Sequence, residues 1–146
     1  MQSDPVYGDV IAEIRGFFKE RISRAQKSGI DRDSIIIDPG IGFGKRLSHN
    51  MALIKHLDSF QSLGVPLMVG VSRKSFIADI LNVPVEERLE GTIASSLISV
   101  FNGANILRVH DVRAVRKAVR VAESILNSEY VPQNQEGNEG ETRHVL

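Results

Sequence analysis

Three short motifs of this 146-residue chain combine charged side chains and glycines in ways that suit the binding of a small anionic ligand. They are DPGIGFGK at 38–45, SRKS at 72–75 and RVHD at 108–111. An ionised carboxylate such as that of Asp38 accepts two N–H donors side by side, and arginine and lysine bind phosphate or carboxylate groups. Glycines let a ligand approach the backbone closely, with N–H groups turned towards it.

Each motif also has a purely structural interpretation. Asp-Pro-Gly is a favourable turn, SRKS can be an exposed basic turn with a helix-capping serine, and Asp111 suits the N-cap of a following helix. The glycine loop matches neither the P-loop nor the GxGxxG pattern. Arg108 is harder to explain structurally, because a charged residue within an apolar strand needs a partner. It lies two residues from His110, so both are expected on one strand face.

The elements that must position these motifs follow a regular order. The apolar pattern predicts helices over 9–28, 48–63, 74–81, 86–102 and 112–127, and strands over 35–37, 65–71 and 106–109. Ser48 is expected to cap the second helix. Helix, glycine and apolar strand therefore occur three times, with glycines at 29, 64 and 103.

Apolar strands that alternate with helices favour an α/β fold with a parallel sheet covered on both faces. Both an open doubly wound sheet and a (β/α)8 barrel fit, and both place function at the carboxyl ends of the strands. Since each motif follows a strand, we expect all three at one rim. Three strands alone would leave unpaired edges, so we expect a partial barrel domain at 1–127 that belongs to a larger barrel. Residues 128–146 lack periodicity and are expected to form a disordered tail.

Composition narrows the functional class. The formal net charge is zero, which argues against a nucleic-acid partner, and the absence of cysteine excludes disulfides and thiolate metal sites. No apolar run reaches the ~18 residues of a membrane span. The first residues lack the basic and apolar regions of a signal peptide, so a cytoplasmic location is expected. The remaining histidines have no metal-ligand spacing, and no metal ligand is assigned.

In their order and spacing, DPGIGFGK, GVSRKSFI and RVHDV resemble the dihydropteroate synthase family, pterin-binding enzymes of folate biosynthesis that sulfonamides inhibit. The resemblance covers about residues 1–127. It implies an incomplete (β/α)8 TIM barrel: the helix after strand five, then strands six to eight with their helices. It also implies condensation of 4-aminobenzoate with 6-hydroxymethyl-7,8-dihydropterin pyrophosphate, Mg²⁺ held mainly by the earlier part of the barrel, and a homodimer.

The resemblance further implies roles for residues at the pterin. Asp38 corresponds to the carboxylate that accepts hydrogen bonds from the amino-pyrimidine edge, and Gly42 to the position where the backbone admits the ring. Lys74 corresponds to the lysine that hydrogen-bonds the pterin and borders the aminobenzoate site. Arg108 corresponds to the arginine that stacks on the pterin and faces the anion, which a planar guanidinium can do.

Three further residues are assigned in the same way. His110 resembles a pyrophosphate ligand, and Phe43 and Ser75 resemble the aminobenzoate pocket, with Ser75 at a helix N-terminus holding the carboxylate. Lys74, Arg108 and His110 are thus the expected catalytic residues. Their expected role is to stabilise the departing pyrophosphate, together with Mg²⁺, because the motifs contain no dedicated general base.

Two alternatives remain open. A non-catalytic half-barrel could bind a partner through its open sheet edges. A relative within the pterin-binding group, such as a methyltetrahydrofolate-dependent methyltransferase, is the other, although SRKSFI and RVHDV argue against it.

Overall fold

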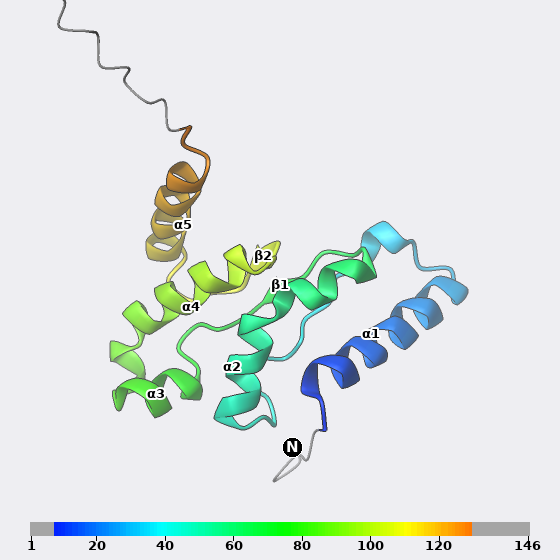
Figure 1. Ribbon diagram of the computed structural model, residues 1–146, viewed down its shortest axis with the longest axis horizontal. Coiled ribbons are helices and arrows are strands. Elements are labelled where there is room, and N and C mark those ends of the chain that lie inside the picture. Colours follow the sequence, from blue (N-terminus) through cyan, green and yellow to red (C-terminus); the bar gives the residue numbers. More distant parts are fainter. Residues whose placement is uncertain (1–7, 130–146) are drawn as a thin grey trace, which may run out of the picture.

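The computed structural model describes residues 8–129, in which helices alternate with short parallel strands (Figure 1). The helices are α1 (Val10–Lys27), α2 (Leu47–Lys55), α3 (Ser75–Leu81), α4 (Leu89–Phe101) and α5 (Val112–Leu126). Short 3-10 helices are η1 (Arg32–Ser34), η2 (Leu57–Leu63) and η3 (Val85–Glu87), and the strands are β1 (Met68–Val69) and β2 (Ile106–Leu107). The tail predicted at 128–146 lies outside the described residues, except for its first two positions.

Three segments pair in parallel around β1. Met68 lies opposite Ile106, and a parallel bridge on the other edge of β1 joins Ile37 to Leu67. The backbone N–H of Met68 donates to the Ile37 carbonyl at 2.8 Å, and the Ile106 N–H donates to the Leu67 carbonyl at 3.1 Å. The predicted α/β alternation and the parallel pairing are therefore confirmed.

The strands are shorter than predicted over 35–37, 65–71 and 106–109. Pro66 has no N–H to donate, and the Leu67 N–H bonds the side-chain oxygen of Asn105 at 2.9 Å instead of a backbone carbonyl. The prediction of a sheet covered on both faces is wrong for the described residues. Ile37 is buried but its neighbour Ile36 is 52% exposed, and alternate strand residues point to opposite faces. One face of the sheet is thus open.

The predicted helix, glycine and strand repeat is confirmed. Helix α1 begins after Asp9, whose carboxylate accepts the N–H groups of Ile11 and Ala12, both at 3.0 Å. Gly29 follows α1 with φ +87°, and Gly64 and Gly103 follow η2 and α4 with φ +64° and +102°. Glycine adopts this left-handed conformation without steric cost, so the chain can leave each helix and enter the next strand.

Two predicted helices are interrupted. The helix predicted over 48–63 consists of α2 and η2, and the one predicted over 86–102 consists of η3 and α4. The side-chain amide of Asn102, the residue after α4, donates to the carbonyls of Ile54 and Lys55 at 2.9 and 3.1 Å, which gives partners to carbonyls at the end of α2. Ser48 is not the N-cap of α2, because the helix begins at Leu47 after Arg46.

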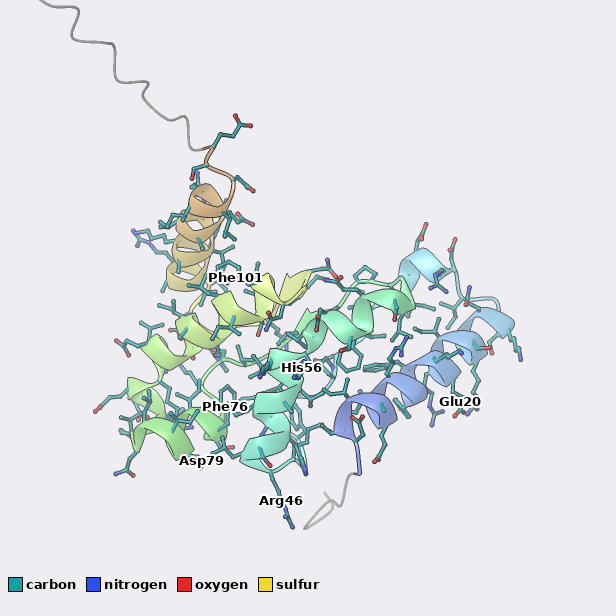
Figure 2. All side chains as sticks on the ribbon, viewed as in Figure 1. Glu20, Arg46, His56, Phe76, Asp79 and Phe101 are labelled. Carbon is teal, nitrogen blue, oxygen red and sulfur yellow. The ribbon has the colours of Figure 1, made fainter. Side chains whose placement is uncertain are left out.

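The apolar core lies where α1, α2 and η2 meet the strands. Its fully buried side chains include Ile41, Leu53, Leu57, Phe60, Leu67, Val69 and Val71. Phe76 of α3 is buried near α2, whereas Arg46 points away from the body of the molecule (Figure 2). Helix α5 packs on α4 and stands at the opposite end of the molecule from α1 (Figure 1). Within residues 8–129, no helix has the length and apolar character to cross a membrane.

Candidate active site

The carboxyl ends of the three parallel segments form one rim. Asp38 follows Ile37 directly, residues 72–75 follow β1, and residues 108–111 follow β2. The parallel register therefore brings the three sequence motifs to the same edge of the sheet, as expected from their positions after strands. Strand β2 ends at Leu107, so Arg108 and His110 lie in the loop beyond it and not on a strand face.

Two hydrogen bonds to side chains restrain the first part of the glycine loop, residues 38–45. The Asp38 carboxylate accepts the Gly40 N–H at 2.8 Å, and the side-chain oxygen of Asn50 accepts the Gly42 N–H at 2.8 Å. Between them, the Ile41 side chain is fully buried in the core, and Asn50 is only 3% exposed. These contacts hold the loop in one shape above the strand ends.

Lys74 crosses this loop. Its ammonium group donates to the Ile41 carbonyl and lies 4.3 Å from the centre of the Phe43 ring. A Cβ added at Gly42, where φ is +80°, would lie 2.7 Å from Lys74 Cδ. Sequence reasoning assigned Gly42 to ligand approach; in this structure the glycine also makes room for the lysine.

Charges at the rim interact with one another. Burial is the main cause that lowers the pKa of Lys74 from its ordinary 10.5; Asp38 opposes this shift, and Arg108 and Lys45 add to it. Burial likewise lowers the pKa of Lys45, against the influence of Asp38. The Asp38 carboxylate thus interacts with the ammonium groups of Lys45 and Lys74, and Lys74 in turn has Arg108 as a charged neighbour.

Arg108 and His110 lie at the same rim, after β2. The Arg108 guanidinium lies over Gly70, where an added Cβ would be 3.4 Å from Nε. The imidazole Nδ1 of His110 lies 2.9 Å from the hydroxyl of buried Ser72, which leaves the other ring nitrogen for a ligand. Both side chains are exposed and can contact an anion.

The two residues expected in the aminobenzoate pocket lie beside Lys74. Phe43 is 49% exposed above the glycine loop, with the Lys74 ammonium over its ring. Ser75 is the exposed first residue of α3. The structure thus brings Phe43 and Lys74 into contact and places Ser75 next along the chain.

Asp111 does not act as the side-chain cap expected for α5. It occupies the N-cap position, but its carboxylate makes no cap hydrogen bond and instead accepts from the Arg73 guanidinium at 2.8 and 2.9 Å. That contact lowers the pKa of Asp111. The Arg73 guanidinium is charged and donates two hydrogen bonds, so it binds the Asp111 carboxylate more strongly than a single backbone N–H at the start of α5 would.

Two site residues were not found from the sequence. Lys45 donates to the carbonyls of Gly40 and Phe43 at 2.9 and 3.2 Å, and Asn50 anchors Gly42. Lys45 could have been noticed as the basic residue that follows the glycines. Asn50 lies in an apolar helix with no local sign that its amide is buried.

A cavity of about 370 Å³ lies beside the loop, lined by Asp38, Gly40 and Lys45 from the loop and by Phe17 and Glu13 from α1. Among the described residues, no three histidine, aspartate or glutamate side chains gather where they could hold a metal ion.

Comparison with known proteins gives a consistent result. A family model described as "Pterin binding enzyme" matches residues 1–110. Dihydropteroate synthase of Escherichia coli K12 is 46% identical over 128 residues, which cover 88% of this chain and 45% of that protein.

Solved structures of dihydropteroate synthases are also similar to this chain. The dihydropteroate synthase of Stenotrophomonas maltophilia with active site-bound imidazole has a TM-score of 0.86 and 38% identity, covering 89% of this chain and 49% of that one. The Xanthomonas albilineans enzyme in complex with 7,8-dihydropteroate has a TM-score of 0.84 and 39% identity, covering 88% and 50% respectively. The chain thus spans about half the length of the relatives it matches.

Proposed function

This chain belongs to the pterin binding enzyme family, and from that premise we propose that it supplies the late-strand half of a dihydropteroate synthase active site. The observation that carries the proposal is the convergence of Asp38, Lys74 and the 108–111 loop at one rim of a parallel sheet. The relatives that match this chain bear that enzyme's name, and one of them is described with 7,8-dihydropteroate bound.

The proposed reaction joins 4-aminobenzoate to 6-hydroxymethyl-7,8-dihydropterin pyrophosphate. The aminobenzoate nitrogen bonds to the exocyclic methylene carbon of the pterin. The bond from this carbon to oxygen breaks, pyrophosphate leaves with the electron pair, and the nitrogen loses a proton. The electron-rich pterin tolerates positive charge on the carbon, so the protein's main task is to stabilise the leaving anion.

Some rim residues bind the pterin ring, and others stabilise the leaving anion. The Asp38 carboxylate accepts N–H donors of the pterin's amino-pyrimidine edge, and the glycine loop, anchored by Asn50, holds the ring against the backbone. Arg108 stacks on the ring and faces the anion, and His110 binds pyrophosphate through its exposed edge.

Lys74 is central because it lies between the two ligands. Its ammonium sits over Phe43, which with Ser75 forms the proposed aminobenzoate pocket. The ammonium is partly desolvated and next to other cations, a setting in which an incoming anion is strongly stabilised. Mg²⁺ would be held mainly by the earlier part of the barrel, where it would add positive charge next to the departing pyrophosphate.

In this proposal, residues 1–127 form strands six to eight of a (β/α)8 barrel. The open face of the sheet and the half-exposed Ile36 support it, since the rest of a barrel would cover them. The parallel bridge at Ile37 and strands β1 and β2 would be the three strands.

In a cytoplasmic homodimer, the apolar residues exposed on α3 and α4 would be covered: Ile80 56%, Leu81 47%, Ile98 49% and Phe101 51%.

The test combines the chain with the amino-terminal half of a dihydropteroate synthase, in one polypeptide or by co-expression. The proposal predicts 7,8-dihydropteroate and pyrophosphate formation that requires both substrates. A stable complex of the two halves that forms no product would contradict it and would favour a non-catalytic, partner-binding half-barrel. Methyl transfer from a folate donor would instead favour the methyltransferase alternative.

A further inference from the structure

Arg73 has an unusual backbone conformation for its residue type. Its φ is +55°, and among the described residues Asn82 is the only other non-glycine residue with positive φ. This conformation is unfavourable for an L-residue with a long side chain, and asparagine tolerates it better. Contacts around Arg73 must therefore hold it in place.

Those contacts restrain the backbone N–H, the carbonyl and two of the three guanidinium nitrogens of Arg73. The Arg73 N–H donates to the hydroxyl of fully buried Thr92 at 2.9 Å, and the Arg73 carbonyl accepts from the Arg88 guanidinium at 2.9 Å. The side chain donates to Asp111 with both Nε and Nη2, at 2.9 and 2.8 Å. Glu86 also faces the guanidinium and favours its charge. The start of α4 thus holds the backbone, and the start of α5 holds the side chain.

This arrangement fixes the two loops that carry the proposed catalytic groups. Lys74 follows Arg73 directly, and the left-handed turn at Arg73 sends the Lys74 side chain back over the glycine loop. Asp111 follows His110, which is itself tied to Ser72 at 2.9 Å. Two parallel links, Ser72 to His110 and Arg73 to Asp111, therefore join the loop after β1 to the loop after β2.

We propose that Arg73 and Asp111 are positioning residues of this site: their two-pronged ion pair sets where Lys74 stands relative to Arg108 and His110. The inference rests on the proposed function for its consequence in catalysis, but the geometric part stands on the contacts alone. The geometry of a two-donor fork is essential, because a single charged bond would fix distance but not orientation.

The first experiment measures the position of Lys74 in the 146-residue chain, without substrate. Burial lowers the pKa of the Lys74 ammonium, with Asp38, Arg108 and Lys45 as its charged neighbours, so its NMR titration reports whether it still lies over the glycine loop. In Asp111→Asn and in Arg73→Lys we expect the Lys74 pKa to move towards its ordinary value of 10.5. Glu20→Gln, which removes the exposed Glu20–Arg24 ion pair of α1, is the matched control and should leave it unchanged.

Arg73→Lys distinguishes positioning from charge alone, because lysine keeps the charge but not the fork. If Asp111→Asn fails to fold, Arg73→Lys decides the question by itself. A Lys74 titration unaltered in a folded variant would overturn the proposal. In folded Arg73→Lys, a Lys74 titration equal to that of the wild type would show that the positive charge at position 73 suffices and that the two-donor fork is not needed.

The second experiment measures kinetics in the two-half enzyme. Misplacing a catalytic group by about 1 Å costs on the order of 100-fold in rate, so Asp111→Asn should lower kcat by about that factor. An increase in KM at unchanged kcat would mean that Arg73 contacts substrate itself and would contradict a positioning role. Failure of the proposed function can be told apart from failure of the positioning proposal. In the first case the wild-type two-half enzyme forms no product, while the Lys74 titration still changes in the Arg73 and Asp111 variants.

Discussion

The side chain of Lys74 crosses the glycine loop through the space left by Gly42: a Cβ at Gly42 would lie 2.7 Å from Lys74 Cδ. The loop and the lysine are therefore one structural unit, although they lie far apart in the sequence. The absence of a side chain at one position determines where the charge at the other can stand. The same loop is held from below by Asn50 and by the buried Ile41.

Gly42→Ala should displace Lys74. Gly44→Ala is the matched control, because Gly44 also has positive φ, at +57°, but no atom lies within 4 Å of an added Cβ. Both variants should lose about 1–2 kcal/mol of unfolding free energy from backbone strain. Only Gly42→Ala should also move the Lys74 ammonium signal in NMR spectra. Equal effects of the two variants on that signal would show that the lysine does not depend on Gly42.

Asn50→Ala should loosen the glycine loop by removing the acceptor of the Gly42 N–H. It leaves the partly buried Gly42 N–H without its acceptor, which should cost about 1–3 kcal/mol of unfolding free energy. Urea denaturation measures this, with exposed Ser48→Ala on the same helix as the control, expected to change stability by about 0.5 kcal/mol or less. Faster hydrogen exchange at the Gly42 amide should accompany the loss in Asn50→Ala. An unchanged exchange rate would argue against the anchor.

The lowered pKa of Lys74 predicts a pH dependence of stability. Between the lowered folded pKa and the ordinary value of 10.5, the unfolded chain binds more protons at this lysine than the folded chain does. The Lys74 contribution to the free energy of unfolding should therefore rise with pH through this window. Urea denaturation of the wild type and Lys74→Met at several pH values isolates the contribution. A stability difference that does not change with pH would contradict the shift.

Two helical glycines should respond oppositely to alanine. An added Cβ at Gly91 of α4 would lie 2.4 Å from Ile77 Cγ2, whereas at Gly16 of α1 nothing lies within 4 Å. Gly91→Ala should destabilise the chain by about 1–3 kcal/mol through overpacking of α3 on α4. Gly16→Ala should stabilise it by about 0.5–1 kcal/mol, because alanine has the higher helix propensity. Thermal unfolding with opposite shifts in Tm would support the packing described; shifts of the same sign would not.

Part of the fold could be predicted because its signals are local. Asp9 before α1 and the glycines at 29, 64 and 103 mark element ends, and each acts within a few residues of its position. The shared rim also followed from the sequence, since parallel strands that alternate with helices place their carboxyl ends together.

What could not be predicted depends on tertiary contacts. Asn102, the residue after α4, donates to the last carbonyl of α2 from 47 residues away in the sequence. Asp111 accepts from Arg73 across 38 residues instead of capping α5. Nothing near Asp111 distinguishes a capping carboxylate from one claimed by a distant arginine. The strands were predicted too long because apolar runs reveal burial but not how many backbone groups find partners.

The most direct test of the account is the rate of 7,8-dihydropteroate formation by the two-half enzyme with Lys74→Ala or Arg108→Ala. Each substitution removes a preorganised cation from the proposed leaving group and should cost about 2–4 kcal/mol of transition-state stabilisation, or roughly 30- to 1,000-fold in kcat/KM. Circular dichroism should show that both variants remain folded. A loss of that size in both would support the proposed site. Near-unchanged turnover in either folded variant would contradict it.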